Sequence, residues 1–183
     1  NPNASPGDER DREIEILARA LLAPSASDVL ARLSSMPALS TDLYRAALLG
    51  GVLEAYSLES PDPARALALL SALRAKDPTN GAIHFVTLAV RSKQGEELAQ
   101  LRPLVLEMLR AKRFETYSDE TSLVIMQHAS ASSSYFLAAG PLHVGTAILN
   151  YSAVAKPLSA YLKSEGARDR ELAEAALPFA RRL

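Results

Sequence analysis

Apolar residues recur through most of this chain at intervals of three and four positions, the spacing that brings side chains onto one face of an α-helix. The clearest example begins after Asp62, whose carboxylate can accept hydrogen bonds from the free N–H groups of a first helical turn. Pro63 suits the first helical position, because its missing N–H would have no partner there. Since the residue before a proline is displaced from the α region, Asp77-Pro78 predicts the end of this helix. Its expected buried face consists of Ala66, Leu69, Leu70 and Leu73.

A second helix is expected directly after this break, and either Thr79 or Asn80 can cap it. Gly95 fits the left-handed conformation that commonly follows the last turn of a helix. The inner face of this helix is expected to consist of Phe85, Leu88, Ala89 and Ser92. Together the two segments predict an antiparallel helical hairpin.

The same spacing predicts helices on both sides of this hairpin. Their approximate ranges are 8–23, 27–37, 40–57, 96–113, 118–139, 142–155 and 169–182. Ser27 is the expected cap of the second of these. Pro103 predicts either a kink in helix 96–113 or a short first turn that ends before Arg102. No alternating strand pattern is longer than about four residues, so the chain is predicted to be all-α.

The end of helix 142–155 is predicted from a second proline. Pro157 is expected to kink or end this helix. Tyr161 and Leu162 are then expected in a turn before Gly166. A final amphipathic helix over about 169–182 carries Leu172, Ala175, Ala176 and Phe179 on its apolar face.

The hairpin resembles part of a tetratricopeptide repeat array, a family with a period of about 34 residues. The positions that carry the resemblance are Ala66, Leu70, Leu73, Pro78, Phe85, Leu88 and Ala89. They fall on the small and apolar positions of that repeat and on its terminal proline, with one extra residue in the turn. The match covers this hairpin alone, and the aromatic, Leu-Gly and Tyr pattern of the family is otherwise missing. The resemblance implies antiparallel helix pairs stacked as an α-solenoid, whereas an irregular helical bundle is the alternative.

Length and composition suggest one domain, with residues 1–8 as a flexible N-terminal tether and residues 9–183 as a single helical domain. Hydrophobic residues make up 48% of the chain but aromatic residues only 5%, so Leu and Ala must form most of the core. With a net charge of −1, the chain has no excess of positive charge to attract phosphate groups, so nucleic acid is not an expected partner. The absence of cysteine excludes disulfides and thiolate metal sites.

The first residues are polar and rich in turn formers, as in a tether that follows a removed bacterial signal peptide or a lipid anchor. This start favours a periplasmic or membrane-tethered location over the cytoplasm, although a position inside a larger protein explains it equally well. The apolar stretch 142–155 is shorter than the roughly 20 residues of a membrane span, so no transmembrane segment is expected.

Catalytic and metal-binding patterns are not apparent in the sequence. His84, His128 and His143 do not occur at helical metal-ligand spacing, and no phosphate-binding loop, dinucleotide fingerprint or nucleophile elbow is present. No catalytic residue, metal or cofactor is therefore predicted, and the chain is not expected to be an enzyme.

Two kinds of binding site remain. The repeat resemblance implies an interaction or scaffolding domain that holds a peptide or protein partner in a groove, and His84 and Arg91 are its candidate contacts by position. The alternative is a helical bundle that binds a small ligand in an apolar pocket lined by His143, Asn150 and Tyr151. Those polar groups can instead be satisfied by neighbouring backbone. An accessory part of a larger enzyme is a third possibility, and the sequence specifies neither the partner nor the oligomeric state.

Overall fold

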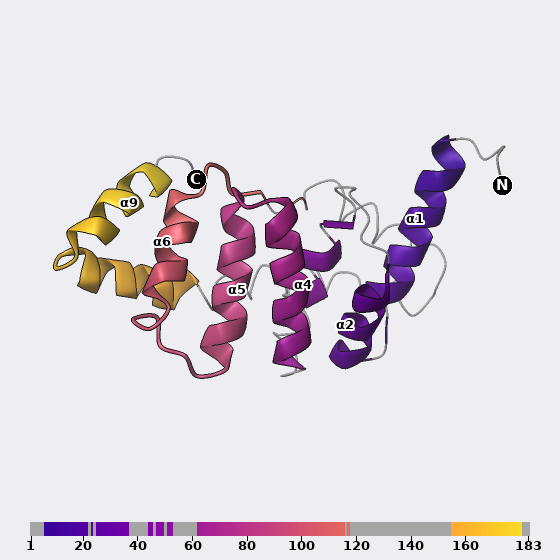
Figure 1. The fold of residues 1–183 in the computed structure, drawn as a ribbon, viewed down its shortest axis with the longest axis horizontal. Coiled ribbons are helices and arrows are strands. Elements are labelled where there is room, and N and C mark those ends of the chain that lie inside the picture. The colour runs from indigo at the N-terminus through magenta and orange to yellow at the C-terminus, as the bar shows by residue number, and fades with distance from the viewer. Residues whose placement is uncertain are drawn as a thin grey trace.

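A computed structural model describes residues 6–21, 23, 25–36, 44–45, 47–49, 51–52, 62–115, 117 and 155–180 of the chain. The regular secondary structure of these residues is helical throughout, which confirms the all-α prediction (Figure 1). The labelled helices are α1 (Pro6–Leu21), α2 (Ala26–Ser35), α4 (Pro63–Lys76), α5 (Gly81–Lys93), α6 (Arg102–Arg110) and α9 (Arg170–Ala180). Residues 44–45, 47–49, 51–52 and 155–166 are helical as well.

Helices α4, α5 and α6 lie side by side and alternate in direction (Figure 1). Helix α5 packs against both α4 and α6, while α2 packs against α4 at one end of the row and α9 packs against α6 at the other. The contacts of α4 with α5 and of α5 with α6 join helices that follow one another in the chain, and residues 77–80 alone connect the first pair. The contacts of α2 with α4 and of α6 with α9 join helices that are farther apart in the chain.

Helix α4 begins, ends and faces the core as its sequence predicts. The Asp62 carboxylate accepts hydrogen bonds from the backbone N–H groups of Ala64 at 3.0 Å and Arg65 at 3.2 Å. Asp77 ends the helix in a non-helical conformation. The buried residues of α4 are Ala66, Leu69, Leu70 and Leu73. Local capping and apolar spacing thus determine this helix almost completely.

Helix α5 is buried on nearly every side. Asn80, the second of the two predicted caps, accepts a hydrogen bond from the N–H of Ala82 at 3.1 Å. Gly95 has a φ of 89°, as expected for a left-handed residue after the last turn. The predicted inner face is incomplete, because Ile83, Val86 and Val90 are buried too. Their burial follows from the position of α5 between two helices, which leaves it no broad solvent face.

The structure corrects two local predictions, the cap of α2 and the extent of the tether, and decides between the two alternatives given for Pro103. Ser25, not Ser27, caps α2, because Ser25 accepts a hydrogen bond from the Asp28 N–H at 3.1 Å and its own hydroxyl donates to the Asp28 carboxylate at 2.8 Å. Pro103 does not kink a longer helix: a separate short turn precedes it, and α6 starts at Arg102. Helix α1 starts at Pro6, so residues 6–8 of the expected tether are helical.

The turn predicted around Tyr161 and Leu162 is wrong, because both residues lie within helix 155–166. Pro157 belongs to the same helix. A proline ring interferes with the residues before it, so the residues that follow can remain helical. The last predicted helix is confirmed as α9, with Asp169 as its cap.

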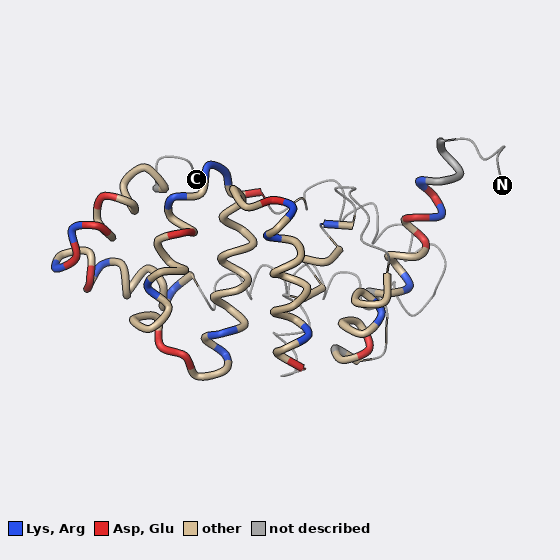
Figure 2. Tube along the Cα trace, viewed as in Figure 1, with Lys and Arg blue, Asp and Glu red and all other residues tan. Residues whose placement is uncertain are grey.

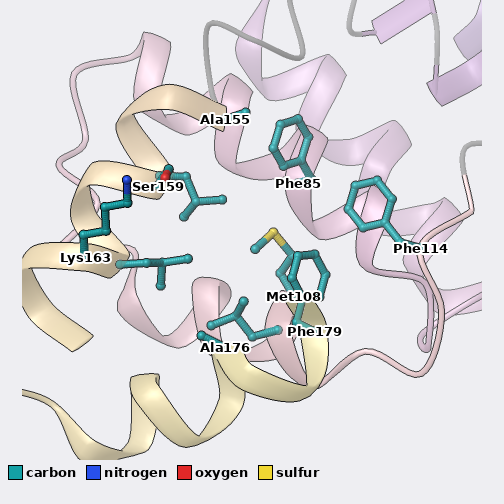
Figure 3. Close-up of a pocket in the computed structure, with 11 residues that line it drawn as sticks. Phe85, Met108, Phe114, Ala155, Ser159, Lys163, Ala176 and Phe179 are labelled. Carbon is teal, nitrogen blue, oxygen red and sulfur yellow. The ribbon is translucent and has the colours of Figure 1, made fainter. Parts of the chain in front are cut away.

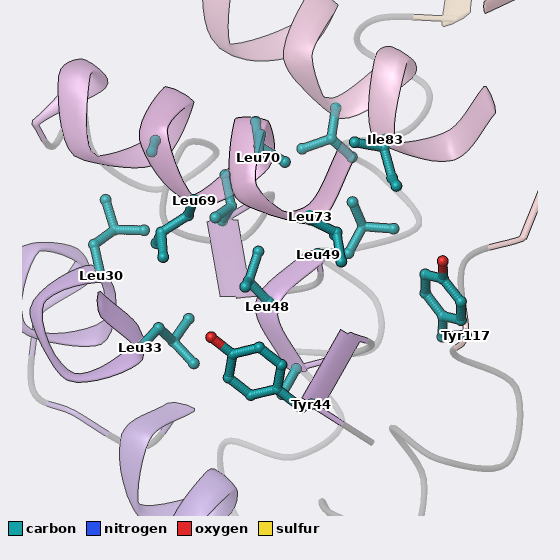
Figure 4. Packing of buried hydrophobic residues seen from close by; sticks show 14 of the residues in the cluster. Leu30, Leu33, Tyr44, Leu48, Leu49, Leu69, Leu70, Leu73, Ile83 and Tyr117 are labelled. Carbon is teal, nitrogen blue, oxygen red and sulfur yellow. The ribbon is translucent and has the colours of Figure 1, made fainter. Parts of the chain in front are cut away.

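Two hydrophobic clusters form the interior. The first joins α1, α2 and α4 to one side of α5 and includes Tyr44, Ala47, Leu48, Leu49 and Val52 (Figure 4). The second joins the other side of α5 to α6, helix 155–166 and α9. Gly81 allows the start of α5 to approach the end of α6, since a Cβ there would lie 3.1 Å from a Phe114 ring carbon and 3.2 Å from the Met108 carbonyl oxygen. In the described part of the chain, no helix combines the length and apolar character needed to cross a membrane.

Candidate functional site

An apolar pocket of about 520 Å³ opens into the second cluster (Figure 3). Its walls come from α5, α6, the segment after α6, helix 155–166 and α9. The lining residues are Phe85, Met108, Leu109, Phe114, Ala155, Leu158, Ser159, Leu162, Lys163, Ala176 and Phe179. A volume of this size lies in the usual range of about 300–1,000 Å³ for small-molecule sites.

Three phenylalanine rings shape the pocket. The Phe114 ring packs edge to face against Phe85, with ring centroids 6.0 Å apart, and against Phe179, with centroids 5.9 Å apart. Such edge-to-face pairs hold aromatic rings in defined orientations. Met108 and Leu109 are fully buried beside them. The aromatic wall is therefore fixed by mutual packing of three segments that are distant in the sequence.

Helix 155–166 supplies the opposite wall through one of its faces. Residues 155, 158, 159, 162 and 163 all line the pocket, and this spacing of three and four positions is that of a single helical face. Leu158 is buried, whereas Ser159 and Lys163 are exposed. The face of this helix that lines the pocket is therefore apolar at Leu158 and polar at Ser159 and Lys163.

Charged residues hold α9 against α6 beside the pocket. The Arg102 guanidinium donates hydrogen bonds to Asp169 at 2.7 Å and to Glu171 at 2.6 Å, and Arg110 donates to Glu171 at 2.6 Å. The hydrogen bonds from Arg102 lower the pKa of both carboxyl groups below their usual range. These ion pairs position Ala176 and Phe179, which α9 contributes to the pocket.

The two candidate partner contacts lie in different environments. His84 is buried, with 3% of its surface exposed, so it offers almost no surface to a partner. Arg91 is partly exposed and donates to the Glu96 carboxylate at 2.8 and 2.7 Å. The structure does not bring the two side chains together into one patch.

His84 belongs to a polar group that spans three helices. Its Nδ1 lies 3.5 Å from a Glu107 carboxylate oxygen, and Arg74 pairs with the same carboxylate at 2.9 Å. Burial is the main cause that lowers the pKa of His84, and Arg74 lowers it further. Glu107 and a hydrogen bond with the Pro78 backbone carbonyl oppose these effects without reversing them. His84 is therefore neutral in the folded protein at neutral pH.

Stability is expected to fall as the pH is lowered below about 6.5, the ordinary pKa of histidine. The unfolded chain then binds a proton at His84 that the folded chain does not, because the folded pKa is lower. The free energy of unfolding should decrease until the pH reaches the folded pKa and level off below it. Urea titrations of wild type and His84→Gln from neutral to mildly acidic pH measure this difference. Equal pH slopes in the two proteins would show that His84 does not titrate in this way.

A second buried polar cluster joins the α4–α5 turn to the segment after α6. Asp77 is buried and accepts hydrogen bonds from the Tyr117 hydroxyl and, at 2.7 Å, from Arg113. The Asn80 side chain donates to the Glu115 carbonyl at 2.7 Å and accepts from the Glu115 N–H at 2.9 Å. Because Asp77 and Asn80 are both hydrogen-bonded to residues of the segment after α6, this cluster stabilises the packing of that segment on the α4–α5 turn.

The pocket predicted from the sequence was assigned to other residues. His143, Asn150 and Tyr151 lie outside the described residues, so the structure does not place them. Ser159 and Lys163 were missed, because residues 157–166 were interpreted as a proline break and a turn. The spacing of positions 155, 158, 159, 162 and 163 was the available signal. Within the described ranges, histidine and acidic residues form no cluster able to hold a metal ion.

Basic and acidic residues are both spread over the described part of the chain, although α4 and α5 themselves carry only basic ones (Figure 2). Comparison of the chain with protein-family models, with curated proteins and with solved structures finds no match. The pocket and its chemistry are therefore the basis for a functional proposal.

Proposed function

We propose that this protein is a non-catalytic binding protein that takes up a small, largely apolar molecule in the pocket between α5, α6, helix 155–166 and α9. One observation carries the proposal: nine of the eleven lining residues are apolar and the other two, Ser159 and Lys163, are polar. A mainly hydrophobic lining with a few polar groups is typical of small-molecule sites.

The energetics support uptake of an apolar molecule. Removing apolar surface from water stabilises a complex by about 25 cal/mol per Å². Phe114 and Phe179 are partly exposed at the pocket, so a bound molecule would cover aromatic surface that now faces solvent. The ring packing also limits the conformational entropy lost on binding, since the rings are already ordered.

Nile red, a neutral fluorophore that emits strongly in apolar surroundings, is expected to bind the 183-residue chain at this pocket. Ala155→Trp should weaken binding at least about tenfold, because an indole would occupy the pocket. Ala160→Trp on the same helix is the matched control, since Ala160 is exposed and does not line the pocket. Fluorescence titration measures both affinities, and circular dichroism checks that each variant is folded.

Equal affinity of the two tryptophan variants, or no binding by the folded wild type, would overturn the proposal. The second outcome would favour partner-protein binding, the function that the repeat resemblance implies. The support for that second candidate is the side-by-side packing of α4, α5 and α6 in alternating directions (Figure 1). Stacked helix pairs of this kind present extended surfaces to peptides and proteins in repeat proteins. Arg91 remains its accessible candidate contact.

A further inference from the structure

The pocket is polar at one edge, and both polar side chains come from one helix. Ser159 and Lys163 are four positions apart, so they are neighbours on the surface of helix 155–166. Figure 3 places them on one side of the pocket and Phe114 on the other. A bound molecule would meet hydrocarbon over most of its length, and a hydroxyl and an ammonium group at one end.

The positive charge of Lys163 is not neutralised within the described part of the chain. Lys163 has no ion pair or hydrogen bond with any residue that the structure describes. Its neighbours one turn away are Ser159, Ala160, Gly166 and Ala167, none of which is acidic. Arg102 and Arg110, by contrast, both pair with acidic residues of the α9 region. The edge of the pocket beside Lys163 therefore suits an anion.

We propose that the ligand is a small amphipathic carboxylate: a single hydrocarbon chain in the pocket, with its carboxylate held by the Lys163 ammonium and the Ser159 hydroxyl. This inference rests on the proposed function, because it names the class of molecule that the same pocket binds. The chain extends toward Phe85, Phe114 and Met108, where the lining is apolar. The carboxylate stays at the exposed edge and keeps part of its hydration, which avoids the cost of burying a charge.

The two parts of the ligand contribute unequally. Burial of the chain supplies most of the affinity, since each buried CH₂ tightens Kd by about fourfold. An ion pair at an exposed lysine contributes less, about 1 kcal/mol at most, because water and salt screen it. One kcal/mol corresponds to about a fivefold change in Kd. Lys163 is thus expected to select the carboxylate over neutral molecules of the same length, while the apolar wall sets the affinity.

The test compares three ten-carbon probes: decanoate and decyltrimethylammonium below their micelle concentrations, and decan-1-ol below its solubility limit. Displacement of Nile red from the 183-residue chain gives each affinity. Decanoate should bind about fivefold tighter than decan-1-ol, and the cation should bind more weakly than either. In Lys163→Gln the preference for decanoate should disappear while the affinity for decan-1-ol stays the same. Lys156→Gln, an exposed lysine of the same helix that does not line the pocket, should retain the preference.

The outcomes separate this inference from the function on which it rests. If decan-1-ol binds as tightly as decanoate, or Lys163→Gln keeps the preference, the carboxylate assignment is wrong although the pocket binds hydrocarbon. If no ten-carbon probe displaces Nile red and Ala155→Trp leaves its binding unchanged, the proposed function fails as well. Added salt should reduce the preference for decanoate, because it screens the ion pair. A preference that is independent of salt would also contradict the inference.

Discussion

Leu70→Asp is expected to prevent the chain from folding. Leu70 is fully buried in the first hydrophobic cluster, which also contains residues of α2 and α5 together with Leu48 and Leu49 (Figure 4). Loss of a buried leucine alone costs about 2–5 kcal/mol. Burial of a carboxylate without a partner adds several kcal/mol, or forces the group to bind a proton. The total approaches the whole stability of a typical domain, about 5–15 kcal/mol.

Ala68→Asp provides the matched control for this substitution, since Ala68 is exposed on the same helix. It introduces the same charge at a cost of about 1 kcal/mol or less, mainly through helix propensity. Circular dichroism at increasing urea concentration measures the free energy of unfolding of each protein. An unfolding transition of Leu70→Asp that coincides with that of wild type would refute the assigned position of α4 in the core.

Asp77→Ala is expected to reduce the free energy of unfolding by about 3 kcal/mol. The substitution leaves the Tyr117 hydroxyl and the Arg113 guanidinium without their buried acceptor. Removing one partner of a buried, hydrogen-bonded ion pair costs about 3–5 kcal/mol. The expected cost is at the lower end of this range, because Arg113 is about half exposed and can form hydrogen bonds with water once Asp77 is removed. Glu174→Ala breaks an exposed ion pair and should change stability by less than about 1 kcal/mol.

The effect of Asp77 should also depend on pH. Burial by itself would raise the pKa of Asp77, but hydrogen bonds from Tyr117, Arg113 and Asn80 outweigh it and hold the pKa below its usual value. The stabilisation is therefore complete above about pH 4 and is lost as the pH falls through the folded pKa. The difference in unfolding free energy between wild type and Asp77→Asn should narrow over that range. A constant difference down to strongly acidic pH would show that another property of Asp77 stabilises the fold.

The candidate site was much less predictable than the helices. Phe85 and Phe179 were expected on apolar faces, and both contribute to the pocket. Their meeting through Phe114 depends on contacts between residues far apart in the chain. His84 was chosen by its place on the helix, but α4 and α6 on either side of α5 bury it. Lys163 was not predicted as a site residue, because the segment around it was interpreted as a turn.

Residues close together in the chain specify the local structure around α4 and α5. Asp62 and Asn80 cap these helices and Asp77 ends the first of them, as expected. Caps, proline restrictions and apolar spacing act within a few residues, so they can be read from the chain alone. The pocket volume, the burial of α5 on both sides and the place of Lys163 at the pocket edge follow instead from tertiary packing. Each depends on which helices pack together, and that choice is made by contacts between distant segments.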